Sequence, residues 1–467
     1  MKLTIQGNIL FLPIEVMNRE YKAKLLLANY FLQAGYSVVI GSIWHMDNLL
    51  ADAEQCVYIT KDFYKYRGDF LKTLHKKNHY VVGWDEEGLI YDTDEYYIGT
   101  QLNDETLKSL DLIITWGERQ KKTITKFLPS CEGKVFSLGN PRLDLLQKHI
   151  AEKIFGIEID YIDKHFGNDY ILANSNFNVA TREDYDAVGM TMEINGATQK
   201  TVELVNRMDV LSKSVASLFF QAVKHISEHF PNKKIILRPH PAENIETLKI
   251  MFQNYKNIFV MKNFAVNPWL VNASIIIHSG CTTGMEAVIM GKKVLSYQPK
   301  ISLDYPDTIP DKVSQVVHTE DELFSVIDSL RDLNKGNALS DNKELMLKDY
   351  VEIDFNKTSC EKILEKIQNQ NKKQHGIARF NVPLFASKKF KNAKDFNNEF
   401  GSLHYDDLQN DLLYIKENMH FDYKQKIFAV NEHVFLIANE TESDLDCKLD
   451  FSKPFRLARR LLKKILK

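Results

Sequence analysis

The sequence predicts an α/β protein that contains two doubly wound units, each a parallel sheet with helices on both faces. Apolar runs of strand length alternate with amphipathic helical stretches along most of the chain, and a second series of this kind begins near Tyr170. Parallel strands need a crossover between them, so this alternation is typical of a parallel sheet. We expect a first domain over 1–165, a second over 166–375 and an extension over 376–467.

The first unit is predicted from apolar runs that are bounded by polar turns. The chain begins with LTIQGNILFLPI, which reads as a strand over 3–14 and is interrupted by Glu15 before it could span a membrane. A helix over 19–35 follows, and Gly35 ends it. Further strands are expected at 36–42, 79–84, 111–117 and 134–140, with a helix over 118–129.

The second unit repeats the pattern. Its strands are expected at 170–176, 234–240, 258–261, 274–280 and 293–298, with helices between them and after the last. From residue 376 the chain changes to short mixed segments rich in Lys, Asn and Phe, in which no site is legible. Ligands of such sheets bind at the carboxyl ends of the strands, and that is where the polar motifs of this chain fall.

The composition describes a soluble globular chain. Of 467 residues, 44% are hydrophobic and 26% are charged, and the net charge of −2 gives no basic field for nucleic acid. No run reaches eighteen apolar residues. The five cysteines are scattered, which favours a reducing cytoplasm, and they lack CxxC spacing, which argues against a structural zinc site.

The C-terminus has a separate character. Residues 453–467 contain seven Lys or Arg and no acid, with Leu and Ile interleaved at helical spacing. This pattern predicts a basic amphipathic helix that lies on an anionic membrane surface. The alternative is a helix that is solvated or docked on the protein's own core.

A histidine turn follows the strand at 234–240. His240 stands between Pro239 and Pro241, so a stiff backbone aims its ring. Arg238 is expected on the same side of the strand, and Glu243 lies close by. A guanidinium and an imidazole together can bind a departing phosphate and protonate it. The ordinary alternative is a histidine that is hydrogen-bonded at a strand end.

A second turn, rich in hydroxyls, joins the strand at 274–280 to a helix. It contains Ser279, Gly280, Thr282 and Thr283, whose small side chains let an anion approach the free N–H groups of the helix N-terminus. Glu286, one turn into the helix, could accept hydrogen bonds from ribose hydroxyls. Ser and Thr are also favoured there simply as helix caps.

The third motif is acidic and belongs to the first unit. Asp85, Glu86 and Glu87 follow the strand at 79–84 and precede Gly88, which suggests a turn. A carboxylate projected into a cleft there could deprotonate an acceptor hydroxyl or attack an anomeric carbon. Acidic loops are more often solvated surfaces, and the spacing does not choose among the three acids.

Taken together, these motifs resemble those of GT-B sialyltransferases and Kdo transferases, whose two Rossmann-like domains face a cleft. RPHP resembles their His-Pro motif, in which the histidine contacts the phosphate of a CMP donor. HSGCTTGMEA resembles their phosphate-binding turn, and Glu86-Glu87-Gly88 resembles their acidic motif, which supplies a base or a nucleophile. Here a third acid, Asp85, precedes that motif.

Several stretches also look like bacterial surface carbohydrate biosynthesis proteins related to Kdo transferases. They cover about residues 5–300 and are FLPIEVMNREYKAKLLLA, WDEEGLIY, TWGERQKK, GNPRLDLL, NSNFN, RPHPAEN and HSGCTTGMEA. The resemblance implies that His240 is a donor-phosphate ligand, that Ser279, Thr282 and Thr283 contact phosphate or nucleotide, and that Glu86 or Glu87 is catalytic. Weaker candidates for the cleft are Arg19, Glu20, Asn140, Arg142, Asn174 and Asn176.

The resemblance implies a cytoplasmic enzyme at the inner face of the membrane that needs no cofactor. A CMP-activated ulosonic or nonulosonic acid would be the donor, and a glycan or lipid-linked glycan the acceptor. Which sugar is moved, and whether its configuration is retained or inverted, stay open. No metal is expected, although Asp92-Thr93-Asp94 matches the short DxD signature of metal-dependent glycosyltransferases.

Two other functions compete with this one. The first is a CDP-polyol phosphotransferase of the teichoic-acid type, which also combines two α/β domains with a strand-end His-Pro. The acidic triplet argues against it, because a carboxylate nucleophile is less useful beside an anionic phosphoryl centre. The second is a non-catalytic partner in polysaccharide assembly, although the histidine, hydroxyls and acids of a catalyst are all present.

Overall fold

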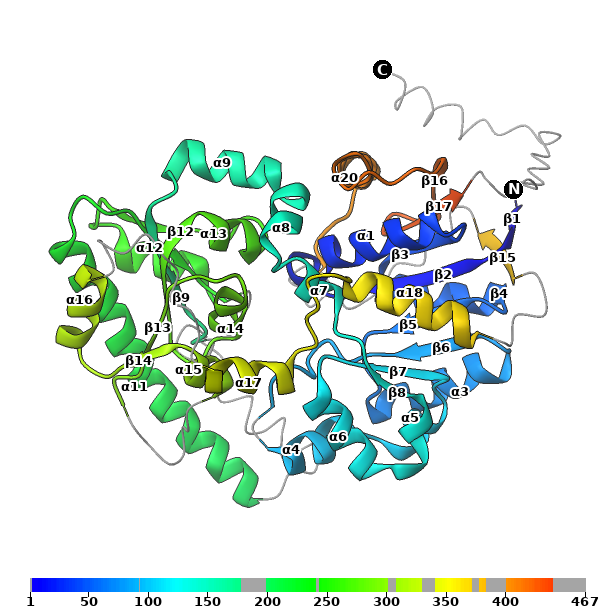
Figure 1. Ribbon diagram of the computed structural model, residues 1–467, viewed down its shortest axis with the longest axis horizontal. Helices are drawn as coiled ribbons and strands as arrows, with labels where there is room; N and C mark the ends of the chain where they lie inside the picture. The colour runs from blue at the N-terminus through cyan, green and yellow to red at the C-terminus, as the bar shows by residue number, and fades with distance from the viewer. Residues whose placement is uncertain are drawn as a thin grey trace.

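The computed structural model describes residues 2–91, 93–177, 199–240, 243–300, 308–329, 341–371, 378–383 and 400–439. These residues form two lobes that lie side by side (Figure 1). Each lobe is built on a mainly parallel sheet, as the alternation of strands and helices predicted. No helix in the described part of the chain combines the length and the apolar character that crossing a bilayer requires.

The sheet of the first lobe has eight strands within the described residues, in the order β16-β17-β3-β2-β5-β6-β7-β8. Its parallel strands are β2 (Ile9–Ile14), β3 (Ser37–Ser42), β5 (Val57–Thr60), β6 (Tyr80–Gly83), β7 (Leu112–Thr115) and β8 (Val135–Ser137). The expected strands at 36–42, 79–84, 111–117 and 134–140 are confirmed with shorter bounds, while β5 was not predicted.

The expectation of one strand over 3–14 is wrong. The segment forms β1 (Lys2–Gly7) and then β2, and the two strands belong to different sheets. Gly7 has a φ of 125°, a conformation that side chains disfavour, so the chain changes direction there. β1 pairs antiparallel with β15 (Ala378–Pro383), which pairs in turn with β4 (Ala53–Glu54).

The last described part of the chain returns to the first lobe. β17 (Val434–Asn439) pairs antiparallel with β3, and β16 (Gln425–Ala429) pairs with β17. Helices α18 (Ser359–Gln370) and α20 (Tyr405–Asn418) lie with this lobe in Figure 1, coloured yellow and orange. The domain boundary expected at 375 therefore differs from the structure, because the apolar face of α18 packs in the first lobe's core.

The second lobe holds a parallel sheet of six strands within the described residues, in the order β11-β10-β9-β12-β13-β14. The strands are β9 (Tyr170–Asn174), β10 (Ile235–Arg238), β11 (Ile258–Val260), β12 (Ala273–His278), β13 (Val294–Tyr297) and β14 (Gln315–Val317). The predicted strands are confirmed here, and β14 is additional. Because β9 lies between β10 and β12, the polar ends of these three strands adjoin.

Helices cover both sheets and connect the lobes. Those of residues 17–166 are α1 (Met17–Gln33), α2 (Ile43–Met46), α3 (Gly68–Lys76), α4 (Asp94–Gln101), α5 (Asp104–Lys108), α6 (Glu118–Phe127), α7 (Pro141–Asp144), α8 (Lys148–Ile154) and α9 (Gly156–Phe166), with short 3-10 turns η1 (Asp47–Asp52), η2 (Lys65–Arg67) and η3 (Pro129–Lys134). Those that follow are α11 (Gln199–His229), α12 (Ile245–Phe252), α13 (Val266–Asn272), α14 (Thr282–Ile289), α15 (Ile309–Val313), α16 (Glu320–Ser329) and α17 (Asp341–Tyr350).

An apolar cluster joins the two lobes. Trp116 and Leu143 of the first lobe belong to the same buried cluster as Trp269 and Met285 of the second. Burial of large side chains at such a junction fixes the lobes against each other. It therefore also fixes the distance between the strand ends that face one another.

Candidate active site

One cavity of about 190 Å³ lies where the carboxyl ends of the two sheets face each other. Both lobes contribute to its wall, which consists of Asn18, Arg19, Glu87, Arg142, Leu145, Asn174, Ser175, Arg238, Pro239, His240, Val266, Asn267, Cys281, Thr282, Thr283 and Glu286. The histidine turn, the hydroxyl turn and the acidic loop therefore meet in one hollow, as the sequence predicted.

The histidine turn is held by a buried carboxylate. His240 lines the cavity, and its backbone N–H donates to Glu243 Oε2 at 2.5 Å. Glu243 also accepts from Ser175 Oγ at 2.8 Å, which ties the turn to the end of β9. Burial raises the pKa of Glu243, and its hydrogen bonds oppose that rise. Glu243 does not line the cavity, so it supports the histidine from behind.

Arg238 lines the cavity but is anchored in the protein. Its guanidinium donates to the carbonyl oxygens of Asn263 at 3.0 Å and Phe264 at 2.6 Å. Burial lowers its pKa to about 10. Phe264 has a φ of 63°, and the hydrogen bond to its carbonyl holds this uncommon backbone conformation. Arg238 therefore adds positive charge to the site while it shapes the neighbouring loop.

Half of the predicted hydroxyl turn reaches the cavity. Thr282 and Thr283 line it from the first turn of α14, where the Gly284 N–H donates to the Cys281 carbonyl at 2.9 Å. Ser279 is fully buried behind them, and its hydroxyl has no hydrogen-bond partner among the described residues. The Gly280 N–H donates to Asp311 Oδ1 at 2.9 Å and is therefore not directed at a ligand.

Buried side chains beneath this turn fix its shape. Asp311, which the sequence analysis missed, also accepts from Ser296 Oγ at 2.6 Å and Gln298 Nε2 at 2.8 Å. His278 packs under α14, and a Cβ added to Gly284 would lie 2.2 Å from its Nε2. Gly284 is thus required by close packing. Burial lowers the pKa of His278 to about 4, so its ring is neutral at pH 7.

The acidic loop presents one of its three carboxylates to the cavity. Glu87 lines it with 53% of its side chain exposed, whereas 5% of the Glu86 side chain is exposed and Asp85 is fully buried. Arg19 Nη1 donates to Glu87 Oε1 at 2.8 Å. Burial raises the pKa of Glu87, but Arg19, together with Arg142 and Lys61, outweighs burial and lowers the pKa.

Asp85 organises the loop from below. It accepts from Tyr97 Oη at 2.8 Å and from the Glu87 N–H at 3.0 Å. Burial raises its pKa to about 7, against these hydrogen bonds. Gly88 leaves room for Gln120, whose Nε2 would lie 1.9 Å from an added Cβ. These contacts hold the backbone from which Glu87 projects.

Glu86 and Glu20 share a buried lysine as counter-ion, and Glu86 also lies 4.0 Å from Arg142 Nη1. Lys24 is buried and lies 2.6 Å from Glu20 Oε2 and 3.2 Å from Glu86 Oε1. Glu20 also accepts from the N–H groups of Glu15 and Val16, at 3.0 Å each, so it caps the start of α1. Neither glutamate lines the cavity, and both have structural partners that the sequence did not reveal.

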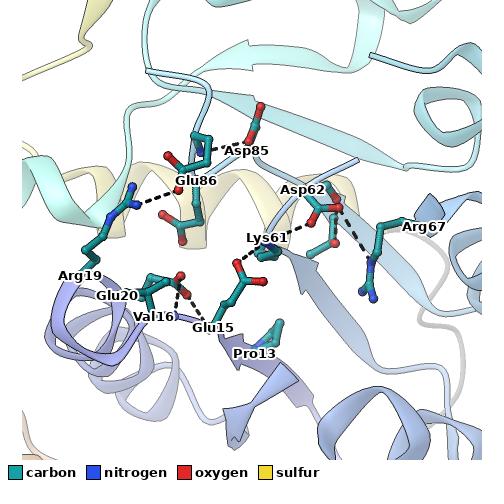
Figure 2. A network of polar contacts seen from close by, with 12 residues as sticks. Pro13, Glu15, Val16, Arg19, Glu20, Lys61, Asp62, Arg67, Asp85 and Glu86 are labelled. Atoms are coloured by element: carbon teal, nitrogen blue, oxygen red, sulfur yellow. Dashed lines mark hydrogen bonds and ion pairs between the residues drawn. The ribbon is translucent and has the colours of Figure 1, made fainter. Parts of the chain in front are cut away.

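Figure 2 shows that this charge network continues along the edge of the first sheet. Lys61, at the end of β5, forms ion pairs with Glu15 and, at 3.4 Å, with Asp62. Arg67 lies 3.9 Å from the other oxygen of Asp62. Acids and cations alternate there, so the edge carries charge without a large net field.

Arg142 spans the cleft. Its Nη2 lies 3.1 Å from Glu286 Oε1 on α14, and its guanidinium stacks 5.2 Å from the Trp116 ring. Asn140 caps α7 by accepting from the Arg142 N–H at 2.9 Å. Asn140 does not line the cavity, and it instead fixes the start of the helix that carries Arg142.

The asparagines after β9 differ in their positions. Asn174 lines the cavity and is buried, and its Nδ2 has no hydrogen-bond partner within the described residues. Asn176 is not among the lining residues. Sequence reasoning missed Asn18, Val266 and Asn267, because single polar or apolar residues at helix starts carry no distinctive pattern.

Two further expectations concern metals and the membrane. Among the described residues there is no group of three or more His, Cys, Asp or Glu side chains placed to hold a metal ion. Asp92 of the DxD triplet is outside the described residues, and Asp94 lies 3.6 Å from Arg119 Nη2. The basic segment 453–467 is also outside them, so membrane attachment stays a prediction.

Comparisons with solved structures place the fold. A histidine-to-asparagine variant of the wall teichoic acid polymerase TagF is similar, with 11% identity over 79% of this chain and 90% of that chain and a TM-score of 0.51. TagF itself gives 12% identity over 79% and 89%, with a TM-score of 0.50.

The fold is GT-B. A UDP-GlcNAc 2-epimerase from Neisseria meningitidis, bound to UDP-GlcNAc, is also similar, at 12% identity over 78% of this chain and 99% of that chain, with a TM-score of 0.46. Neither a family model nor a curated protein matches the sequence. At these identities the likeness establishes the architecture, and the chemistry has to be argued from the cavity.

Proposed function

We propose that this protein is a glycosyltransferase of surface polysaccharide synthesis that transfers an acidic ulosonic or nonulosonic sugar from a CMP-activated donor. One observation carries the proposal. His240 and the first turn of α14, from the second lobe, line the same cavity as Glu87, from the first. A phosphate-binding side thus faces a carboxylate, which is the arrangement that transfer from a nucleotide-activated sugar requires.

The second lobe would bind the leaving group. The C–O bond between the anomeric carbon and the phosphate breaks, and its electron pair goes to the phosphate oxygen of CMP. Thr282, Thr283 and the N-terminus of α14 stabilise that charge through hydroxyls and the positive end of the helix dipole. His240, in protonated form, can donate a proton to the departing phosphate.

The first lobe would act on the other side of the anomeric carbon. Glu87 is ionised at neutral pH because Arg19 lowers its pKa. It can accept the proton of the acceptor hydroxyl as that oxygen attacks, which inverts the configuration. Alternatively it attacks first and forms a glycosyl ester, which retains the configuration after a second displacement. Both routes use the same carboxylate.

A second candidate is a CDP-polyol phosphotransferase, and the similarity of the fold to a wall teichoic acid polymerase favours it. That reaction would use the phosphate-binding side in the same way. It would gain little from Glu87, because a carboxylate repels the anionic phosphoryl group that is attacked. The exposed position of Glu87 in the cavity therefore favours sugar transfer.

The proposed setting is the cytoplasmic face of the membrane, and the proposed acceptor is a growing glycan, free or on a lipid carrier. The basic segment 453–467 would hold the enzyme on anionic lipid. We expect transfer to proceed without a metal ion, since His240, Arg238 and the α14 N-terminus supply positive charge beside the phosphate.

Calorimetric titration with CMP, CDP and UDP, followed by turnover assays with CMP-nonulosonic acid and CDP-glycerol, tests the proposal. We expect CMP to bind best and CMP-sugar turnover to fall at least 100-fold in Glu87→Gln and in His240→Ala. Glu105→Gln and His75→Ala, which change exposed residues outside the cavity, are matched controls. Turnover of CDP-glycerol alone would establish the second candidate. Unchanged polysaccharide synthesis in both cavity variants would indicate a non-catalytic assembly partner.

A further inference from the structure

Arg142 forms an ion pair across the cavity, from one lobe to the other. It begins in α7 of the first lobe and reaches Glu286 on α14 of the second, with 12% of each side chain exposed. Its Nη1 lies 3.5 Å from the Glu86 carbonyl, at the base of the acidic loop. Arg142 therefore stands between the carboxylate side of the cavity and the phosphate-binding turn.

The other two guanidiniums of the cavity already have a role, one in holding the backbone and the other in pairing with the proposed reacting group. Arg238 gives two short hydrogen bonds to backbone carbonyls, at 3.0 and 2.6 Å. Arg19 pairs with Glu87, the proposed reacting group, at 2.8 Å. Arg142 pairs with Glu286 at 3.1 Å and makes two longer contacts with Glu86, at 3.5 Å to its carbonyl and 4.0 Å to its carboxylate, although a guanidinium has five N–H donors in a planar fork. It retains capacity for a bidentate anion.

The neighbouring Trp116 and Asn140 hold the Arg142 guanidinium in place without accepting hydrogen bonds from it. The Trp116 ring lies 5.2 Å away and sets the plane of the guanidinium, and the Asn140 cap fixes the helix that carries it. Glu286 is the nearer of its two counter-ions, and it is also available to a ribose hydroxyl. A planar, pre-positioned guanidinium with an exchangeable partner is suited to carboxylate recognition.

The proposed donor places a carboxylate at this point. In an ulosonic acid the carboxylate is bonded to the anomeric carbon, which is itself one oxygen away from the phosphate. With that phosphate at Thr282 and Thr283 and the anomeric carbon facing Glu87, the carboxylate falls between the two sides. The donor thus brings two negative groups, and the α14 turn with His240 accounts for only one of them.

We propose that Arg142 binds the carboxylate of the donor sugar, exchanging its ion pair with Glu286 for a bidentate contact, and so selects acidic sugars. This inference rests on the proposed function, because it takes a CMP-activated acid as the donor. Glu286, released from Arg142, then accepts hydrogen bonds from the ribose. The two lobes become linked through the donor instead of through the Arg142–Glu286 pair.

The test compares two affinities in each variant. One is for CMP, and the other is for a 3-fluorinated CMP-nonulosonic acid, in which fluorine slows the loss of CMP. Their ratio isolates what the sugar contributes. In Arg142→Gln we expect the ratio to fall about 10- to 100-fold while CMP affinity changes little, because a charged bidentate contact is lost. Arg142→Lys should recover only part of the ratio.

Glu286→Gln should change the affinity ratio in the opposite direction. It removes the competing carboxylate, so the ratio should rise even where CMP itself binds more weakly. Arg119→Gln is the matched control, since this arginine also stacks on aromatic rings but does not line the cavity. Thermal unfolding of each variant checks that the fold is intact.

The outcomes separate this inference from the proposed function. If the wild-type protein binds neither CMP nor the fluorinated donor, the proposed function fails. If the wild type prefers the fluorinated donor and Arg142→Gln keeps the same ratio, only the role of Arg142 fails. A third result would overturn the proposal. In it, the wild type binds CDP-glycerol more tightly than CMP, Arg142→Gln loses this difference, and the affinity for the acidic sugar does not change. Arg142 would then bind a second phosphate.

Discussion

At the scale of single residues, the charge of Glu87 is set by the cations around it. Burial raises the pKa of Glu87, and Arg19, Arg142 and Lys61 together lower it by more, with Arg19 the foremost of the three. In Arg19→Gln only Arg142 and Lys61 oppose burial, so the pKa of Glu87 should rise and less of it should be ionised in mildly acidic solution. We expect the acidic limb of the kcat/KM profile to move to higher pH.

The profile of kcat/KM against pH measures this shift directly. Arg19→Lys keeps a cation near Glu87 and should leave the limb close to its original position. Lys65→Gln removes an exposed cation from the turn after β5 and serves as the control. An unchanged limb in Arg19→Gln would mean that Glu87 is not the group whose ionisation limits the rate.

Asp311 offers a second prediction at this scale. Its carboxylate holds the Gly280 N–H and two side chains beneath the α14 turn. Asp311→Ala leaves the Gly280 N–H and the Ser296 hydroxyl buried without an acceptor, which should lower stability by about 2–4 kcal/mol and weaken CMP binding by about tenfold. Denaturant unfolding and CMP titration measure the two effects.

Asp311→Asn keeps one acceptor oxygen and should lie between the wild type and Asp311→Ala. Asp321→Ala, an exposed acid on α16, is the control. If Asp311→Ala binds CMP with wild-type affinity while it is destabilised, the turn holds its shape without this carboxylate. The residue would then be purely structural.

The sequence predicted where the site lies, but it did not predict which of the neighbouring acids reaches the cavity. The motifs placed His240 and Thr283 near each other because the strand ends of one parallel sheet meet at the same edge. The expectation of two domains that face a cleft placed Glu87 opposite them. They could not tell Glu87 from Asp85 and Glu86. That choice depends on Lys24 and Tyr97, which approach from α1 and α4 and leave no local signature.

At the scale of elements, the strands β16 and β17 complete the first sheet. β17 covers the edge of β3 with four buried residues in register, from Val434 to Ile437. A chain that ends at residue 399 would expose that edge and the apolar side of α1, so we expect it to aggregate. Expression yield and size-exclusion chromatography distinguish it from a chain that ends at residue 439, which should stay monodisperse.

A shorter truncation tests the basic segment separately. Removal of residues 453–467 leaves β16 and β17 in place, so the melting temperature and turnover of a soluble acceptor should not change. Membrane fractionation should change, because seven cations are lost. Replacement of those cations by Gln keeps the length and is the matched variant. Wild-type fractionation of both variants would remove the anchor hypothesis.

Sequence analysis missed these last strands for a physical reason. Parallel strands are recognised by the helices that alternate with them, whereas β16 and β17 form an antiparallel hairpin without that signal. The run VFLIAN after the short turn at 430–433 was the available cue. The partner of that hairpin is β3, about 400 residues earlier, and no local pattern indicates such pairing.

At the scale of the whole molecule, the two lobes form one site because a shared apolar cluster holds them together. The sequence predicted two units from repeated alternation, but their relative position depends on Trp116, Leu143, Trp269 and Met285, which meet across the junction. The apolar pattern of the sequence predicts that such residues are buried, but it does not show which lobe they pack against. The cavity volume follows from this packing.

Acid sensitivity is the prediction that belongs to the whole molecule. His79 and His278 are fully buried, and burial lowers the pKa of each from 6.5 to about 4. Below pH 6.5 the unfolded chain binds protons at these two histidines that the folded protein refuses, so their contribution to stability falls as the pH drops from 6.5 toward 4, while Asp85, whose pKa is raised to about 7, contributes in the opposite direction. Each histidine should cost about 2 kcal/mol by pH 5.

Denaturant midpoints measured from pH 7 to pH 5 test this sum. His79→Gln, which lies outside the cavity, removes one titrating group and should flatten the dependence by about one proton, even if it lowers stability at pH 7. His149→Gln changes an exposed histidine and should leave the slope unchanged. Because His278 packs under Gly284, the same acid titration should weaken CMP binding before the molecule unfolds. Equal pH slopes in the wild type and in His79→Gln would show that this ring takes up its proton in the folded state.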